Sequence, residues 1–308
     1  MLAIASILLI FVQTAQMQSD VDLRLEIEKE IKNFPGKVWI SACNLNKGIT
    51  FNLAGDERVR TASTIKLPIL VALHGEVKEG RLSWEEKLVV TKKTRAQGAG
   101  ILLEMDDGHS LTLREASKLM VVVSDNIATN LILERVGIDK VNAWMDKLQL
   151  PKTKSLAWIG GEVVSKARSA DWNKRADGST YGIGVTTPNE MVNLLTRLAQ
   201  GEIISPEDSK QILALMGRQQ YKDGIGRNMR GASVANKPGA LDRLRSDVGI
   251  ITVGKEKFAL AITLDDMTVP PDWSPDNTAL KMLSKLSEVL VANLKSQQEP
   301  KKAGATKP

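Results

Sequence analysis

A serine and a lysine at one-turn spacing are the first residues of this chain that could do chemistry. Ser63 and Lys66 are followed by an almost wholly apolar run at residues 67–73. Residues three apart share a helix face, so the hydroxyl of Ser63 would lie near the ammonium of Lys66. A buried helix would keep Lys66 away from water, and desolvation lowers the pKa of an ammonium group. A neutral Lys66 could then accept the proton of Ser63 and make it a nucleophile.

So short a motif also arises by chance and gains meaning only from its partners. A Ser-Asp-Asn run at residues 124–126 links two predicted helices, and a Lys-Pro-Gly run at residues 237–239 stands just before a predicted strand. Ser124 can pass a proton to a leaving nitrogen, Asn126 can hold a substrate amide, and Lys237 can bind a carboxylate. The three clusters together predict acyl transfer.

The order and spacing of these motifs carry a family resemblance. The stretches are Ala-Ser-Thr-Ile-Lys at 62–66, Leu-Thr-Leu-Arg-Glu at 111–115 leading to Ser-Asp-Asn-Ile-Ala-Thr-Asn-Leu at 124–131, and Thr-Thr-Pro at 186–188. The chain resembles the class A β-lactamases of the serine β-lactamase and penicillin-binding superfamily. The resemblance covers roughly residues 23–294, which is nearly the whole mature chain.

The candidate site follows from the residues and agrees with what the resemblance implies. Ser63 is the nucleophile, Lys66 its base and Ser124 the proton donor, while backbone N–H groups of Ser63 and Ala240 could hold the developing oxyanion. The candidate substrate-binding residues are Asn126, Lys237, Gly239, Ala240, Arg243 and Arg245.

Two features depart from the family pattern. The Glu-x-x-Leu-Asn segment, whose glutamate positions the deacylating water in class A enzymes, is absent, and the loop that should carry it is longer than usual. Glu162 is the one carboxylate in about the right place, and it is either the deacylating residue or a solvated surface carboxylate. Pro238 replaces the usual threonine or serine, which removes a hydroxyl and a backbone donor. Arg243 and Arg245 either compensate by binding a carboxylate or are simply exposed beside a turn.

The elements that must position these residues can be read from the apolar pattern. An amphipathic helix over 23–34 precedes a hairpin of 37–45 and 49–53, and strands at 248–253 and 258–264 precede a final helix carrying Leu280 to Leu294. Three more helices are marked by caps at Thr112, Thr187 and Ser205. Pro68, one turn into the Ser63 helix, should kink it.

This order predicts an α+β fold. Early and late strands must pair in one antiparallel sheet flanked by the N- and C-terminal helices, with an inserted all-helical lobe. The predicted boundaries are an α/β lobe at 21–62 and 218–296 and a helical lobe at 63–217. Residues 152–185 show no sustained period, and the site is expected between the lobes.

Composition excludes several classes of function. The net charge of +6 is modest for 308 residues, and two tyrosines with four phenylalanines give no aromatic-interleaved basic stretch, so nucleic-acid binding is not predicted. Cys43 is the single cysteine, and His74 and His109 lack metal-ligand spacing. No cofactor, metal or stable membrane partner is predicted, and the chain is expected to be a monomer.

The ends of the chain suggest export. Residues 1–20 begin with an apolar segment too short to span a bilayer and continue into a polar stretch, the pattern of a signal peptide, although no Lys or Arg precedes the apolar run. Periplasmic or secreted localisation is therefore predicted. Residues 297–308 are polar, basic and end in proline, which predicts a disordered tail.

Three functions follow from this site. The first is opening of β-lactam rings through an acyl-Ser63 intermediate. The second is a D-alanyl-D-alanine peptidase acting on cell-wall peptides, which would not need the missing glutamate. The third is a slowly deacylating penicillin binder or sensor. The extent of the resemblance to class A enzymes places the β-lactamase first.

Overall fold

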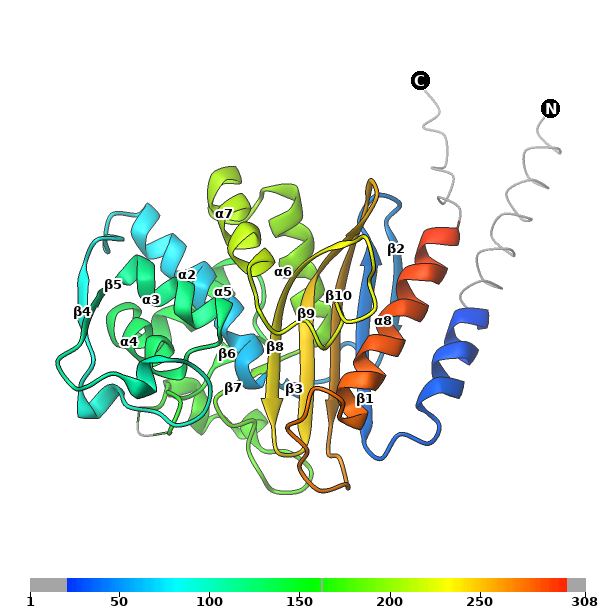
Figure 1. Cartoon of the computed structure of the whole chain (residues 1–308), viewed down its shortest axis with the longest axis horizontal. Helices are drawn as coiled ribbons and strands as arrows, with labels where there is room; N and C mark the ends of the chain where they lie inside the picture. The colour runs from blue at the N-terminus through cyan, green and yellow to red at the C-terminus, as the bar shows by residue number, and fades with distance from the viewer. Residues whose placement is uncertain (1–20, 162, 298–308) are drawn as a thin grey trace.

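The computed structural model describes residues 21–161 and 163–297, and a five-stranded antiparallel sheet stands at its centre (Figure 1). The strands are β1 (Lys37–Asn44), β2 (Ile49–Leu53), β8 (Ser233–Leu241), β9 (Leu244–Val253) and β10 (Glu256–Asp265). Their spatial order is β2-β1-β10-β9-β8, so β1 pairs with β10 across more than 200 residues of sequence. The predicted pairing of early and late strands in an α+β fold is confirmed.

The edge of this sheet differs from the prediction. The Lys-Pro-Gly run lies inside β8, paired with β9 from Ser233↔Thr252 to Leu241↔Leu244, rather than just before a strand. β8 is the outermost strand, which is where a proline can lack an N–H without breaking a ladder between two neighbours. Because Pro238 is atypical of a strand, the sequence did not predict β8, but the proline does not prevent an edge strand from forming.

Two helices cover one face of the sheet. The helix that the structure describes over 21–31 and α8 (Thr278–Ser296) lie side by side in Figure 1. Leucines at 283, 286, 290 and 294 recur at helical spacing and are buried against strand residues such as Phe258 and Ile262. The apolar stripe read from the sequence is the face that seals this core.

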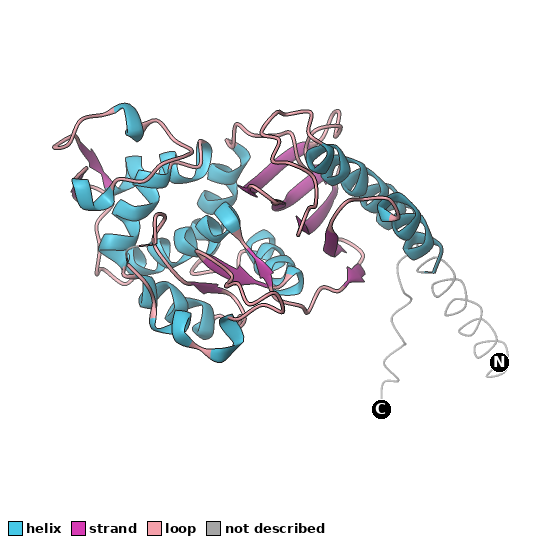
Figure 2. Cartoon of the chain, turned by 90° about the horizontal axis from the view of Figure 1, so that it is seen from below, coloured by secondary structure: helices cyan, strands magenta, loops and turns pink. Residues whose placement is uncertain are grey.

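The remaining helices lie on the other side of the sheet. They are α2 (Lys66–Lys78), α3 (Leu113–Val122), α4 (Asn126–Val136), α5 (Ile138–Lys147), α6 (Pro188–Gln200) and α7 (Pro206–Gly217). Figure 2, seen from below, shows them separated from α8 by the strands. Because α6 packs on β1 and β10 while α7 packs on β8, part of this set belongs to the sheet's own core. The division into lobes at residues 62 and 218 stays a prediction.

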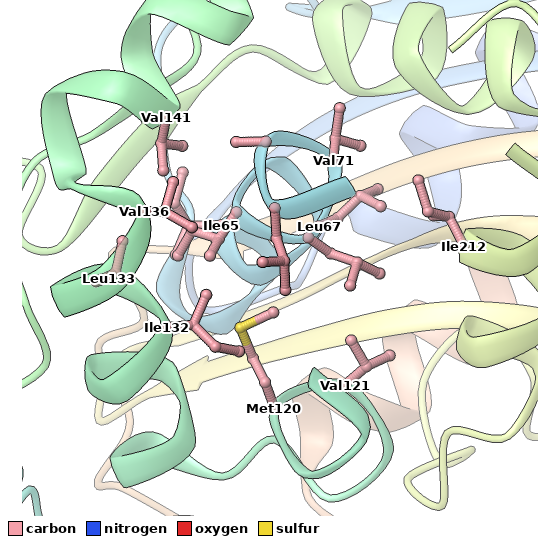
Figure 3. Close-up of a cluster of buried hydrophobic side chains, with 14 of the residues drawn as sticks. Ile65, Leu67, Val71, Met120, Val121, Ile132, Leu133, Val136, Val141 and Ile212 are labelled. Atoms are coloured by element: carbon pink, nitrogen blue, oxygen red, sulfur yellow. The ribbon is translucent and has the colours of Figure 1, made fainter. Parts of the chain in front are cut away.

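Helix α2 is the centre of the helical layer. Leu67, Val71 and the residues between them are buried, and Figure 3 shows Met120, Ile132 and Val141 around the helix on three neighbours. Apolar residues surround α2 on every side, as its unbroken apolar run predicted. This packing fixes the start of α2, where the candidate base stands.

Helix starts follow the predicted caps. Thr112 and Glu115 form a reciprocal capping box, Thr187 accepts from the amide of Glu190, and Ser205 accepts from the amide of Asp208. Each contact satisfies an amide that the first turn of a helix leaves without a partner. These side chains fix where the three helices begin, and α3 is the one that leads to Ser124.

Shorter elements complete the described chain. The strands are β3 (Val59–Arg60), β4 (Lys87–Val89), β5 (Ser110–Thr112), β6 (Lys154–Ser155) and β7 (Gly184–Thr186). The 3₁₀ helices are η1 (Ala62–Ile65), η2 (Lys92–Thr94), η3 (Leu102–Glu104), η4 (Lys166–Ser169) and η5 (Asp171–Asn173). The aperiodic stretch at 152–185 is thus two short strands joined by 3₁₀ turns.

Some predictions fall outside the described residues: the leader at 1–20, the tail from 298 and Glu162. Within residues 21–161 and 163–297, none of the helices combines the length and the apolar character needed to cross a bilayer.

Candidate active site

Ser63 lies in a 3₁₀ turn rather than in the α-helix itself. The turn η1 begins at Ala62, whose φ of 45° is left-handed, and α2 begins only at Lys66. Side chains three apart are eclipsed in a 3₁₀ helix, so Ser63 and Lys66 still share a side. The later start also corrects the prediction of a kink: Pro68 stands in the first turn of α2, where its missing N–H costs no intrahelical bond.

Ser124 is held by a strained link between α3 and α4. Its φ of 56° is left-handed, which is uncommon for a serine. Asp125 fixes the link as the N-cap of α4, since its Oδ1 accepts the amide of Ala128 at 2.9 Å. The other carboxylate oxygen accepts the amides of Ile101 and Leu102 at 2.7 and 2.9 Å. Asp125 thereby joins α4 to the loop that borders the site.

Lys66 is fully buried and turns toward this link. Its Nζ donates to the carbonyl oxygen of Ser124 at 2.5 Å, to Oδ1 of Asn126 at 2.8 Å and to Oγ of Ser124 at 3.2 Å. Among the described residues, no hydrogen bond joins Lys66 to the hydroxyl of Ser63. Burial and the charge of Lys237 lower the pKa of Lys66 well below its usual value, and Asp125 opposes them. The neutral amine that a base requires is therefore favoured.

Lys237 reaches the same hydroxyl from β8. Its Nζ donates to Oγ of Ser124 at 3.0 Å and to the carbonyl oxygen of Pro238 at 2.8 Å. Burial lowers the pKa of Lys237 to about 7, against the opposing charge of Asp247. Ser124 therefore stands between two buried amines, an arrangement suited to moving a proton.

Gly239 brings the backbone of β8 against the nucleophile. A Cβ at this position would lie 2.7 Å from the carbonyl oxygen of Thr61 and 3.0 Å from the backbone nitrogen of Ser63. Only glycine permits this approach, which sets the strand beside the amide expected to bind the oxyanion. Ala240 follows directly and lines the same cavity.

A cavity of about 560 Å³ unites most of the candidates. The predicted residues in its wall are Ser63, Ser124, Asn126, Gly239, Ala240 and Arg245. Lys66 and Lys237 are fully buried and reach the cavity through Ser124. The cavity is also lined by Trp273, by Leu280 of α8 and by Asn277, the N-cap of that helix. The sequence did not assign these residues to the site.

The two candidate arginines have different positions. Arg245 is 3% exposed and lines the cavity, where it donates to the carbonyl oxygens of Leu244 and Asp272 at 2.7 and 2.5 Å. Its guanidinium lies 4.6 Å from the ring centre of Trp273. Arg243 instead donates to the carbonyl oxygen of Met267 at 2.6 Å and does not line the cavity.

Asn126 and Asn130, one turn apart on α4, order two loops. Asn126 donates from Nδ2 to the carbonyl oxygen of Gln97 at 2.7 Å. Asn130 exchanges two hydrogen bonds of 2.9 Å with the backbone of Ile159. The second contact ties the loop three residues before Glu162, and Glu162 itself lies outside the described residues.

Three polar residues near Lys237 were not identified from the sequence: Asn236 on β8, Asp247 on β9 and Lys222 in the loop before β8. Asp247 and Asn236 are fully buried and hydrogen bonded to each other, and Lys222 contacts Asn236. Asn236 directly precedes Lys237, which was the one available signal. Burial of an aspartate inside β9 could not be read from its surroundings in the sequence.

Comparison with known proteins gives a consistent result. A model of the β-lactamase enzyme family matches residues 22–294. The β-lactamase VEB-1 of Pseudomonas aeruginosa is 25% identical over 248 residues, covering 75% of this chain and 78% of that protein. A β-lactamase of Bacillus licheniformis is 27% identical over 244 residues, covering 78% and 74%.

Solved structures agree with the fold. A β-lactamase from Sphaerobacter thermophilus superposes with a TM-score of 0.75 at 25% identity, covering 89% of this chain and 96% of the other. PBP-A superposes with a TM-score of 0.73 at 24% identity, covering 90% and 97%. A leucine-to-glutamate variant of PBP-A, solved as its acyl-enzyme with penicillin G, superposes with a TM-score of 0.73 at 25% identity, covering 90% and 97%.

Proposed function

The chain belongs to the β-lactamase enzyme family, a family of hydrolases that act on β-lactams, and we propose that it opens the β-lactam ring through an acyl intermediate on Ser63. The observation that carries this proposal is the position of Ser124. Its hydroxyl lies within hydrogen-bond distance of two buried lysines, in the wall of the cavity that Ser63 also lines.

Acylation uses Lys66 as the base. Neutral Lys66 takes the hydroxyl proton of Ser63 while Oγ forms a bond to the lactam carbonyl carbon. Negative charge develops on the carbonyl oxygen, and the backbone N–H groups of Ser63 and Ala240 are the proposed donors to it; the close approach of Gly239 to the backbone of Ser63 supports this assignment. Donors fixed in advance stabilise this charge without having to reorient.

Ring opening uses Ser124 as the proton donor. As the carbon–nitrogen bond breaks, Ser124 gives its proton to the ring nitrogen and recovers one from protonated Lys66, 3.2 Å away. Cationic Lys237 orients the hydroxyl of Ser124, and with Arg245 it supplies positive charge for a substrate carboxylate. Asn126 holds the substrate amide at the opposite wall.

Deacylation requires a base for water, and Glu162 is proposed for that step. The support is the anchoring of its loop by Asn130 at Ile159. The absence of a Glu-x-x-Leu-Asn segment keeps a second candidate open, a peptidase or penicillin binder whose acyl-enzyme persists. The likeness to PBP-A in an acyl-enzyme complex favours testing it directly.

One experiment separates these functions. The purified mature chain is mixed with a fluorescent penicillin, the adduct is followed by intact mass, and excess unlabelled drug is then added. An adduct that is absent in Ser63→Ala and clears within seconds, with hydrolysed product, supports a β-lactamase. A persistent adduct supports the second candidate. No adduct on the parent chain contradicts acyl transfer to β-lactams.

Location and assembly belong to the same proposal. The leader-like residues 1–20 support export to the periplasm or medium, and the chain is proposed to act as a monomer. Release of a shorter mature chain, detected by its mass, tests the first, and light scattering tests the second.

A further inference from the structure

Asp247 on β9 is a fully buried carboxylate that the proposed reaction does not use. It is paired across the strands with Pro238, the residue after Lys237, and it lines the cavity. Among the ion pairs of the described residues, none includes it. A buried carboxylate without a direct salt bridge lowers the stability of a fold. Because such groups occur preferentially at functional sites, a role for Asp247 toward the neighbouring lysine is expected.

Each group that is hydrogen bonded to the carboxylate of Asp247 is an N–H group, which can donate but not accept. Asn236 donates from Nδ2 to Oδ1 and Oδ2 at 3.1 and 3.0 Å, and the amide of Ile225 donates to Oδ2 at 3.1 Å. The orientation of Asn236 is fixed in turn, because the ammonium of Lys222 lies 3.1 Å from its Oδ1 and can only donate. The site is therefore built for the ionised form of Asp247.

The loop over Asp247 is shaped to reach it. A Cβ on Gly224 would lie 2.4 Å from Oδ2 of Asp247, so the backbone approaches as only glycine allows. The same approach brings the amide of Ile225 to the carboxylate. Two separate parts of the chain, β8 and the loop at residues 222–225, thus converge on one negative charge.

Most charged groups around Asp247 are cations. They are Lys237 on β8 and Lys222 on the loop before β8, which act on Asp247, and Arg245, two residues before it on β9 in the same cavity wall. The loop also carries Asp223, and α8 contributes the uncharged Asn277, Leu280 and Leu283. The charge of Asp247 acts on Lys237 against the effect of burial.

We propose that Asp247 is a positioning residue: the buried counter-charge that keeps Lys237 cationic beneath Ser124, with Asn236 holding the carboxylate ionised. This inference rests on the proposed role of Lys237 in acylation. It assigns a purpose to the Asn236–Asp247 pair, which sets the upper pH limit of the reaction by deciding where Lys237 loses its proton.

The test is the pH dependence of acylation by a penicillin, measured by quenched intact mass from pH 5 to 9. Asp247→Asn should lose about tenfold in rate at pH 8 and about twofold at pH 6, because one unit of pKa is a tenfold change in the charged fraction. Asp242→Asn, which removes an exposed carboxylate from the turn of the same hairpin, should follow the parent. A profile for Asp247→Asn that keeps the parent's shape, whether or not it is scaled down, overturns the proposal.

A second readout does not depend on activity. The free energy of unfolding is measured against pH in a Ser63→Ala background. Burial raises the pKa of Asp247 to about 6, so a chain that keeps Asp247 should lose stability as pH rises from about 4 to about 6. Asp247→Asn should lack this loss, and its stability should begin to rise with deprotonation of Lys237 at a lower pH than in the parent. An unchanged curve contradicts the inference even if the parent is never acylated. Should Asp247→Asn fail to fold, Asn236→Ala replaces it: without its hydrogen bonds the pKa of Asp247 rises further, so the fall in stability with pH should extend to higher pH than in the parent.

Discussion

Two clusters of cations in the described part of the chain have opposite kinds of partner. At the end of β10, Arg60 donates from Nε to Asp265 at 2.8 Å, and Arg175 lies 2.7 Å from Asp266 and 3.7 Å from Asp265. Below the cavity wall at Ser124, Lys66 and Lys237 instead donate to hydroxyl, amide and carbonyl oxygens.

The difference shows in the pKa of each group. The hydrogen bond that Arg60 donates to Asp265 is the largest influence on Arg60 and raises its pKa, which secures the charge. Burial is the largest influence on Lys66 and Lys237 and lowers the pKa of both. A cation with a carboxylate partner joins parts of the fold, whereas a cation without one is ready to exchange a proton.

Removing the base should have the largest effect. Lys66→Met fills the same space without a proton acceptor, so the rate of Ser63 acylation should fall by about 10³-fold, within the range of general-base catalysis. Stopped-flow mixing with a chromogenic β-lactam measures the rate. Arg175→Met is the matched control from the paired cluster, and a comparable loss there would remove the distinction between the two places.

Breaking the paired cluster should change stability instead. Asp265→Asn leaves Arg60 buried without its partner, and the free energy of unfolding should drop by about 3 kcal/mol. Urea denaturation measures the drop. The acylation rate per folded molecule should stay within about twofold of the parent's, and a larger loss of rate would mean that the cluster also serves the chemistry.

Much of this contrast lay beyond the sequence. The helix caps and the apolar α2 are local patterns, and they predicted the fold correctly. The structure brings Ser63 and Ser124 into one cavity wall with Lys66 hydrogen bonded to Ser124, and the roles assigned to these residues stay predictions. Which charges acquire partners is a matter of tertiary contact: Arg243 and Arg245 look alike in the sequence, yet only Arg245 lines the cavity. The burial of Asp247 could not be predicted for the same reason, whereas the edge strand β8 was missed because Pro238 lies inside it.

The unpaired lysine also predicts a pH effect on stability. Lys237 has a pKa of about 7 in the fold and about 10.5 when unfolded, so the unfolded chain binds more protons between these values and stability rises with pH there. Between pH 7 and 8.5 the rise should be about 1–2 kcal/mol. Lys237→Met should reduce the rise by this amount in thermal or urea unfolding, while Lys66, whose pKa burial also lowers, still contributes a rise; an unaltered slope would show that burial does not lower the pKa of Lys237.

The smallest effect is expected from restoring a hydroxyl at position 238. Pro238→Thr adds a donor beside Lys237 on the edge strand, so KM for carboxylate-bearing β-lactams should improve by about fivefold, the worth of one hydrogen bond. Steady-state kinetics measure it, with Pro238→Val as the control of similar shape. Equal gains in both variants would assign the effect to the backbone.

The most direct measurement is the titration of the lysine side chains by ¹⁵N NMR, with Lys66→Met and Lys237→Met used to assign the two signals. The account predicts that Lys237 titrates near pH 7 and that Lys66 loses its proton far below the range of exposed lysines. If both amines stay charged up to pH 10, Lys66 cannot be the base, and the proposed proton transfer between Lys66, Ser124 and the substrate is contradicted.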